Sequence, residues 1–209
     1  MPSFPSRRTV LTTAAATLVA GPAYARARIV TMLGDSITAG LGLAAAQALP
    51  ARLEAELNRI APPVRVRAAG VSGDTTTGGL ARVNFSVQAD TGLCLVALGG
   101  NDLLQGIDVR TTQANLTAIV RRLKARRIPV ALAGLSAPIA IGAHYARDFS
   151  ALFARVAAGE HIPLYPDLLA GVARIPALNQ SDGIHPNARG VLVIARRLAP
   201  FLARLLAAR

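Results

Sequence analysis

Short apolar runs alternate with longer amphipathic segments along most of this chain, starting near residue 28. Most of the runs are almost continuously apolar, which is typical of strands buried on both faces, whereas the run at 64–69 alternates valine with arginine. The runs predict strands at residues 28–33, 64–69, 93–98, 129–135 and 162–165.

The segments between these runs repeat their apolar residues at helical spacing. They predict helices at residues 49–60, 76–89, 111–127, 143–159 and 187–208, with the last helix bent near Pro200. Strands that alternate with helices indicate right-handed crossovers and a parallel sheet with helices on both faces. Because no repeat, linker or second region interrupts the pattern, residues 26–209 are expected to form a single α/β domain.

The first 25 residues differ from this pattern and are expected to be an export signal. Arg7 and Arg8 precede an apolar stretch at 10–20, and the Ala-Tyr-Ala sequence at 23–25 supplies the small residues of a cleavage site. The sequence at 6–11, Ser-Arg-Arg-Thr-Val-Leu, resembles a twin-arginine signal. The apolar stretch is short for a membrane span, so a periplasmic or secreted location is expected rather than an N-terminal anchor.

The chain is strongly basic, with a formal net charge of +12. Its arginines are spread along the predicted helices, and the densest basic run, at 121–127, continues an amphipathic helix as its solvated face. Without a nucleic-acid-binding signature we expect no nucleic-acid partner, and the alternative is a basic exported protein that binds nucleic acid or anionic membranes. The single cysteine, Cys94, lies in an apolar run and is expected to be buried rather than reactive.

Three segments far apart in the chain carry candidate chemistry. They are Gly-Asp-Ser-Ile-Thr at 34–38, Gly-Gly-Asn-Asp at 99–102 and Asp-Gly-Ile-His-Pro at 182–186. The first two follow predicted strands and the third opens the last helix, so all three can meet at the carboxyl edge of a parallel sheet. Together they supply a serine, an asparagine and a histidine with a nearby carboxylate, a set sufficient for acyl transfer through a serine nucleophile.

These segments, with Ala-Gly-Val-Ser-Gly-Asp-Thr at 69–75, resemble the sequence blocks of the SGNH hydrolases, also called the GDSL family. Within that family the chain is most similar to the small bacterial arylesterases and acyl-thioesterase/lysophospholipases. The resemblance runs from about residue 28 to the C-terminus, and Ile37 stands where the family name has leucine. It implies a flavodoxin-like three-layer sandwich with about five parallel strands, and an ester hydrolase without a cofactor.

The resemblance assigns a role to each block. Ser36 is expected to be the nucleophile and His185 the general base and acid, with Asp182 orienting the imidazole. Ser36, Gly70 and Asn101 are expected to supply the hydrogen-bond donors of an oxyanion hole. The chain contains no Gly-x-Ser-x-Gly elbow, so the α/β-hydrolase fold is not expected, and no His or Cys cluster points to a metal site.

Each of these residues also has an ordinary structural interpretation. Ser36 could cap a helix, Asp182 could stabilise a turn, His185 could be a surface histidine, and the segment at 99–102 fits a simple turn. The combination of all the blocks, each at the end of a strand or the start of a helix, favours the catalytic interpretation.

We therefore expect an exported, metal-free serine hydrolase that cleaves small carboxylic esters, or thioesters, through an acyl-enzyme intermediate. Aryl esters, short or medium acyl esters and lysophospholipid esters are all compatible with the resemblance. The alternatives are a carbohydrate O-acetyl esterase and a non-catalytic protein that binds acyl or anionic ligands. Ile139, Ile141 and Tyr145 follow the fourth predicted strand and are expected to line the acyl side of the cleft. The sequence leaves the oligomeric state open.

Overall fold

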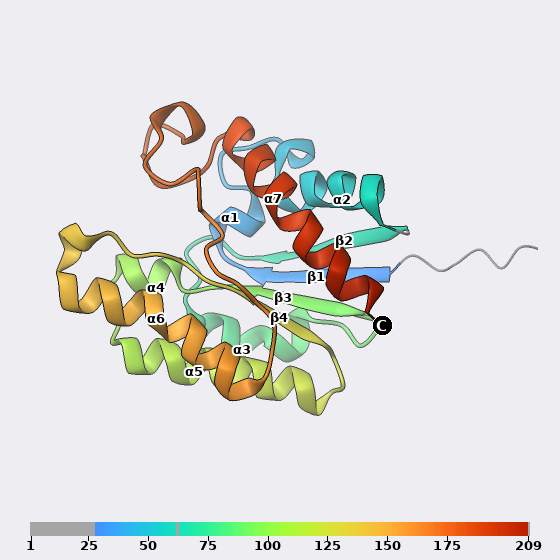
Figure 1. The fold of residues 1–209 in the computed structure, drawn as a ribbon, viewed down its shortest axis with the longest axis horizontal. Coiled ribbons are helices and arrows are strands. Elements are labelled where there is room, and N and C mark those ends of the chain that lie inside the picture. Colours follow the sequence, from blue (N-terminus) through green and yellow to red (C-terminus); the bar gives the residue numbers. More distant parts are fainter. Residues whose placement is uncertain (1–27, 62, 209) are drawn as a thin grey trace, which may run out of the picture.

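A parallel sheet runs through the centre of the computed structural model, with helices on both of its faces (Figure 1). The structure describes residues 28–61 and 63–208, so the predicted export signal at 1–25 lies outside the described residues. The strands are β1 (Arg28–Gly34), β2 (Val64–Gly70), β3 (Leu93–Ala97), β4 (Val130–Ala133) and β5 (Leu164–Tyr165). Their order across the five-stranded sheet is β2-β1-β3-β4-β5, which confirms the predicted α/β fold.

Long helices form the two outer layers. One face of the sheet is covered by α2 (Leu49–Ile60) and α7 (Ala188–Ala207), and the other by α3 (Thr76–Ser86), α5 (Val109–Ala125) and α6 (Ala143–Glu160) (Figure 1). Shorter elements lie in the loops: α1 (Ser36–Ala39), α4 (Gly100–Leu104), and the 3₁₀ turns η1 (Ala45–Gln47), η2 (Ile139–Ile141) and η3 (Pro176–Leu178). Pro200 lies inside α7, and the helix continues beyond it to Ala207.

The core lies where the central strands meet the apolar stripes of the helices. Every residue of β3 is buried, including Cys94, which has no exposed surface. A fully buried valine or leucine side chain stabilises the fold by about 1.5–3 kcal/mol relative to exposure. The Val-Arg alternation of β2 follows from its position at the sheet edge, where Val64 is buried and Arg65 faces solvent.

The carboxyl ends of the strands lie together at one edge of the sheet, on the left in Figure 1. Gly34, the last residue of β1, pairs with Gly70 of β2 on one side and with Ala97 of β3 on the other. Because these strand ends are level, the segments that follow them emerge side by side. Among the described residues, no helix is both long and apolar enough to span a membrane.

Candidate active site

Ser36 is the first residue of α1, directly after the turn that ends β1. The N-cap of this helix is Asp35, whose Oδ1 accepts a hydrogen bond from the Ile37 N–H at 3.0 Å. The capping interaction is therefore made by Asp35, and the Ser36 hydroxyl is left to bond elsewhere. Ser36 is 7% exposed, and its Oγ lies 2.9 Å from Nε2 of His185.

His185 connects the serine to a carboxylate. Its Nδ1 lies 2.6 Å from Oδ2 of Asp182, while Nε2 faces Ser36. A carboxylate on Nδ1 favours the tautomer with the proton on that nitrogen, and this leaves Nε2 free to accept the serine proton. The structure thus brings the three predicted catalytic residues into one continuous chain of contacts.

Asp182 is held in its ionised form by hydrogen bonds. Its Oδ1 accepts the backbone N–H groups of His185 at 3.0 Å and of Ile184 at 2.9 Å. These donors, together with the His185 side chain, lower the pKa of Asp182 to about 2, led by the His185 backbone bond. The tight turn is closed by Gly183, which adopts a φ of +71°.

The backbone around His185 is fixed by neighbouring groups. The His185 carbonyl accepts the Gln180 N–H at 2.8 Å, and Asn179 pairs with Pro186 in an isolated bridge. Asn187 caps α7, because its Oδ1 accepts the N–H groups of Arg189 and Gly190. The histidine therefore sits on a braced segment at the start of the last helix.

The predicted oxyanion-hole residues come from the two neighbouring strands. Gly70 ends β2, and Asn101 lies in the first turn of α4, after Gly99 turns the chain with a φ of +120°. Asn101 Nδ2 donates to the Asp74 carbonyl at 2.9 Å. Because a primary amide carries two N–H groups, this bond fixes the amide and leaves a second donor.

Position 70 requires a glycine, because the end of β2 lies against the backbone of α1. A Cβ at this position would lie 2.4 Å from the Ala39 nitrogen and 2.8 Å from the Asp35 carbonyl oxygen. The absence of a side chain thus allows the end of β2 to approach the backbone that carries Ser36. The close approach that Gly70 permits is therefore made by α1.

Asp35 is a buried carboxyl group beside the nucleophile. Burial raises the pKa of Asp35 to about 6, against the opposing effects of the Ile37 backbone bond and the nearby His185. Gly100 at the start of α4 lies close enough that a Cβ there would be 3.1 Å from Asp35 Oδ2. The loop after β3 therefore packs directly on the turn that carries Ser36.

A small apolar cleft of about 100 Å³ opens beside Ser36 and His185. Most of the cleft is lined by loops and short helices at the carboxyl edge of the sheet. Its apolar side chains are Ile37, Leu103, Leu104, Leu135, Leu169 and Ile184. Asn101 also lines it. The cleft is suited to a short hydrocarbon group placed next to the serine.

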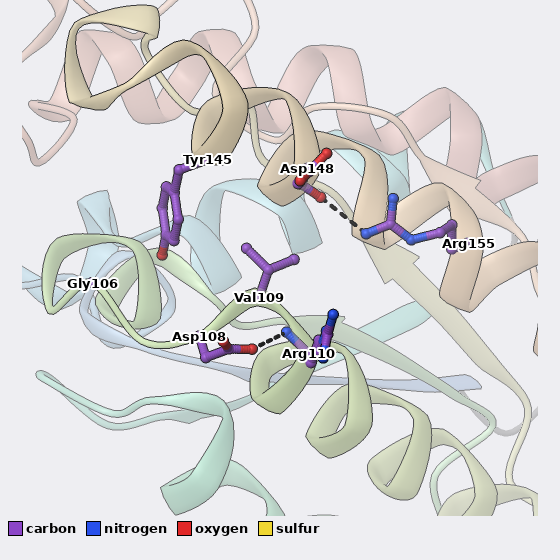
Figure 2. A pocket seen from close by; sticks show the side chains of 7 residues that line it. All are labelled: Gly106, Asp108, Val109, Arg110, Tyr145, Asp148 and Arg155. Atoms are coloured by element: carbon purple, nitrogen blue, oxygen red, sulfur yellow. Dashed lines mark hydrogen bonds between the residues drawn. The ribbon is translucent and has the colours of Figure 1, made fainter.

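The side chains expected to line the acyl cleft lie elsewhere. Ile139 is 77% exposed and Ile141 is 46% exposed on η2, and neither lines the cleft. Tyr145 lines a separate, more open pocket of about 610 Å³ between α5 and α6 (Figure 2). Its hydroxyl donates to the Ile107 carbonyl at 2.9 Å, which holds the ring on that side. Within the described part of the chain, no group of His, Cys, Asp and Glu residues is arranged to hold a metal ion.

A model of the GDSL-like Lipase/Acylhydrolase family matches residues 32–192, the part of the chain that contains every contact of this site. The chain belongs to this family. The predicted resemblance to the GDSL hydrolases is therefore confirmed.

Curated relatives of this GDSL hydrolase include known hydrolases. It is 36% identical over 180 residues to the Esterase TesA of Pseudomonas aeruginosa. The matched region covers 86% of this chain and 90% of that protein. It is 35% identical over 164 residues to "Thioesterase 1/protease 1/lysophospholipase L1" of Escherichia coli K12. The matched region covers 78% of this chain and 77% of that protein. The family and these relatives confirm the predicted enzyme class, a carboxylic ester hydrolase.

Solved structures show the same fold. A crystal structure of TesA is similar with a TM-score of 0.80 at 34% identity, covering 85% of this chain and 99% of that chain. The structure of AlinE4, an SGNH-hydrolase family esterase, has a TM-score of 0.72 at 39% identity, covering 87% of this chain and 97% of that chain. The sandwich predicted from the sequence is thus the fold of GDSL hydrolases.

Proposed function

We propose that this GDSL hydrolase cleaves carboxylic esters through an acyl-enzyme intermediate on Ser36. The observation that carries the proposal is the chain of contacts from Ser36 Oγ to His185 Nε2 at 2.9 Å and from His185 Nδ1 to Asp182 Oδ2 at 2.6 Å. A serine hydroxyl is a weak nucleophile until an adjacent base removes its proton, and this geometry supplies the base and its orienting carboxylate.

In the first half of the reaction, His185 Nε2 takes the Ser36 proton while Oγ attacks the ester carbonyl carbon. The carbonyl π electrons move to oxygen, and the Ser36 N–H, the Gly70 N–H and Asn101 Nδ2 stabilise the negative charge. When the tetrahedral species collapses, the C–O bond to the alcohol breaks and His185 returns the proton to the leaving oxygen. Water then repeats the sequence to release the acid and free Ser36.

The cleft supports a preference for small acyl groups. Its volume of about 100 Å³ and its leucine and isoleucine lining favour a short or medium hydrocarbon chain over a polar sugar. We propose aryl and short-chain acyl esters as the first substrates to test, with lysophospholipid esters and thioesters as further members of the class. The apolar lining disfavours the alternative of a carbohydrate O-acetyl esterase.

The test is hydrolysis of p-nitrophenyl esters, from acetate through decanoate, by residues 26–209 and by the Ser36→Ala variant. We expect turnover that is lost in Ser36→Ala by a factor of about 10⁴ or more, because the nucleophile is removed while the fold is kept. The dependence on chain length then measures the depth of the acyl site. Equal turnover in both proteins would contradict the assignment of Ser36, and binding of esters without turnover in either would favour the non-catalytic alternative.

A further inference from the structure

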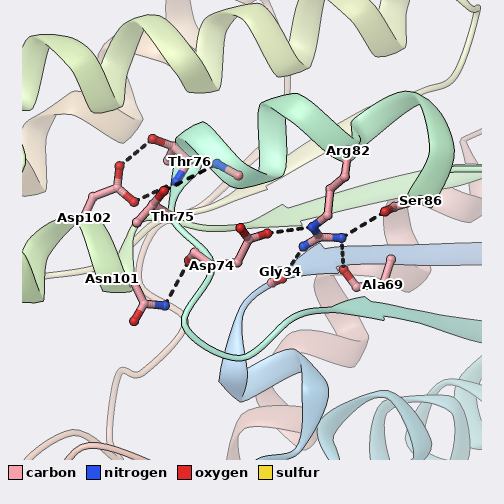
Figure 3. A network of polar contacts seen from close by, with 10 residues as sticks. Gly34, Ala69, Asp74, Thr75, Thr76, Arg82, Ser86, Asn101 and Asp102 are labelled. Atoms are coloured by element: carbon pink, nitrogen blue, oxygen red, sulfur yellow. Dashed lines mark hydrogen bonds and ion pairs between the residues drawn. The ribbon is translucent and has the colours of Figure 1, made fainter.

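Arg82 lies on α3, and its side chain points from the helix toward Gly34, Ala69 and Asp74 (Figure 3). Its side chain is only 18% exposed, and its guanidinium group donates hydrogen bonds in several directions at once. Nε donates to Asp74 Oδ2 at 2.6 Å, and Nη2 donates to the Gly34 carbonyl at 2.8 Å. Nη1 donates to the Ala69 carbonyl at 2.8 Å and to Ser86 Oγ at 3.1 Å.

The backbone partners of Arg82 stand next to two of the proposed oxyanion donors. Gly34 is the last residue of β1, two positions before Ser36. Ala69 directly precedes Gly70 at the end of β2. One guanidinium group therefore bonds to the ends of both strands at once.

The remaining donor is reached through Asp74. The carboxylate of Asp74 pairs with Arg82, and its carbonyl accepts Asn101 Nδ2 at 2.9 Å (Figure 3). The Asp74 side chain is 11% exposed, so the charge-assisted bond between Asp74 and Arg82 is shielded from water and only weakly screened by salt. The position of the Asn101 amide is thus tied to Arg82 through a single residue.

We propose that Arg82 is a positioning residue for the oxyanion hole, and this inference rests on the proposed function. Donors of an oxyanion hole stabilise the transition state when they lie about 2.7–3.1 Å from the charged oxygen, and their benefit falls steeply when they are displaced. The planar guanidinium presents its donors in a fixed fork, which suits the task of bonding to the ends of two strands and to the Asp74 carboxylate at once. A lysine ammonium can keep the charge but not this geometry.

The loop has a second anchor that is independent of Arg82. The buried carboxylate of Asp102 accepts the Thr76 N–H at 2.8 Å and also the Thr76 hydroxyl, which fixes the start of α3 to α4. Loss of Arg82 is therefore expected to shift the donors rather than to unfold the loop.

The test compares Arg82→Lys and Arg82→Gln with a matched control, Arg67→Lys. Arg67 lies on β2 and pairs with Asp90 at 2.6 and 2.9 Å, outside the network of Arg82. We expect kcat for a p-nitrophenyl ester to fall about 10- to 100-fold in both Arg82 variants, with KM changed less than about 3-fold, because misplaced donors weaken transition-state binding. The Arg67 variant is expected to keep the wild-type kcat.

Two readouts separate positioning from a general loss of stability. A trifluoromethyl ketone, which forms a tetrahedral adduct with the serine, should bind the Arg82 variants more weakly in proportion to their loss of kcat/KM. Combining Arg82→Lys with Asn101→Ala should cost less than the product of the single losses, since both act on the same oxyanion. A kcat within 2-fold of wild type, unchanged adduct affinity or fully multiplicative losses would overturn the proposal.

Ser36→Ala, assayed beside these variants, separates a failure of the proposed function from a failure of the role proposed for Arg82. Turnover retained in Ser36→Ala would overturn the proposed function, whereas turnover lost in that variant but normal in the Arg82 variants would overturn the role of Arg82 alone. If neither Arg82 variant folds, Asp74→Asn breaks the ion pair from the other side and keeps the carbonyl that Asn101 uses. That variant is expected to lower kcat in the same direction, and a wild-type kcat would overturn the proposal.

Discussion

The carboxyl group of Asp35 differs from that of Asp182, because burial raises the pKa of Asp35 to about 6, whereas hydrogen bonds lower the pKa of Asp182 to about 2. The unfolded chain would release this proton near the ordinary value of 3.8, while the folded chain keeps it until about pH 6. The folded state therefore binds more protons in this range, and the contribution of Asp35 to stability is full below pH 3.8 and lost as pH rises to about 6.

Asp35→Asn tests this directly. The asparagine keeps the oxygen that caps Ile37 and removes the ionisation. The stability of the variant relative to wild type should increase by up to about 3 kcal/mol between pH 4 and pH 8, because about two pKa units separate the folded and unfolded states. Urea unfolding of both proteins at pH 4 and pH 8 measures this difference in the free energy of unfolding. Asp182 titrates in both proteins, so its opposite effect cancels, and a difference that does not depend on pH would contradict the prediction.

At the level of elements, the site depends on how closely the end of β2 packs against α1. Gly70→Ala should lower both stability and kcat, because the added methyl group meets the Ala39 nitrogen and the Asp35 carbonyl, which are backbone atoms. Overpacking of this kind costs about 1–3 kcal/mol. Thermal unfolding and p-nitrophenyl ester turnover measure the two effects.

Gly159→Ala is the matched control for that substitution. Gly159 lies in α6, and a Cβ there would meet no atom within 4 Å. Replacing a helical glycine with alanine should raise stability by about 1 kcal/mol and leave turnover unchanged. Equal effects of the two substitutions would show that the contact between β2 and α1 is not the cause.

The elements could be predicted from the sequence to different extents. β1 is buried from Val30 onward and β3 is buried throughout, so their apolar pattern was sufficient. β5 was expected at 162–165 but has two residues, Leu164–Tyr165, between Pro163 and Pro166, which supply no backbone N–H to a ladder. α3 was expected to reach residue 89 but ends at Ser86, because the backbone becomes extended at Val87.

Parts of the candidate site could likewise be predicted from the sequence, and other parts could not. Ser36, Asn101 and His185 stand at strand ends or a helix start, where a parallel sheet brings segments together whatever the loop paths. The cleft walls were missed, because Leu169 and Ile184 lie in the irregular segment between β5 and α7, whose path depends on tertiary packing. Arg82 was missed, because its bonds to the backbone carbonyls of Gly34 and Ala69 depend on how the strands pack and leave no pattern in the sequence.

At the scale of the whole molecule, some of the many basic side chains form bonds between helices. In the basic run at 121–127, Arg121 and Lys124 contact Glu160 of α6, and Arg122 donates to the Leu80 carbonyl of α3. This surface was expected to be a solvated helix face. It is largely exposed, but its charged groups also tie α5 to the helices on either side.

The N-terminal segment belongs to the same scale, because an export signal at residues 1–25 is expected to decide where the enzyme works. We expect Arg7→Lys combined with Arg8→Lys to block export in a bacterium that has a twin-arginine pathway, since that pathway reads the arginine pair. Cell fractionation and mass spectrometry of the mature N-terminus measure this, and the exported wild-type protein should begin at residue 26. Export of the double variant, or an exported protein that retains residues 1–25, would contradict the prediction.

The single cysteine has a consequence for how this protein can be studied. Cys94 is fully buried in the middle strand of the sheet, and burial raises the pKa of its thiol to about 12. A thiol reagent in water reaches this sulfur when β3 is uncovered, so the speed of labelling reports how often the centre of the molecule opens. The enzyme thus carries its own probe of internal motion, without an introduced dye or a second cysteine to complicate the signal.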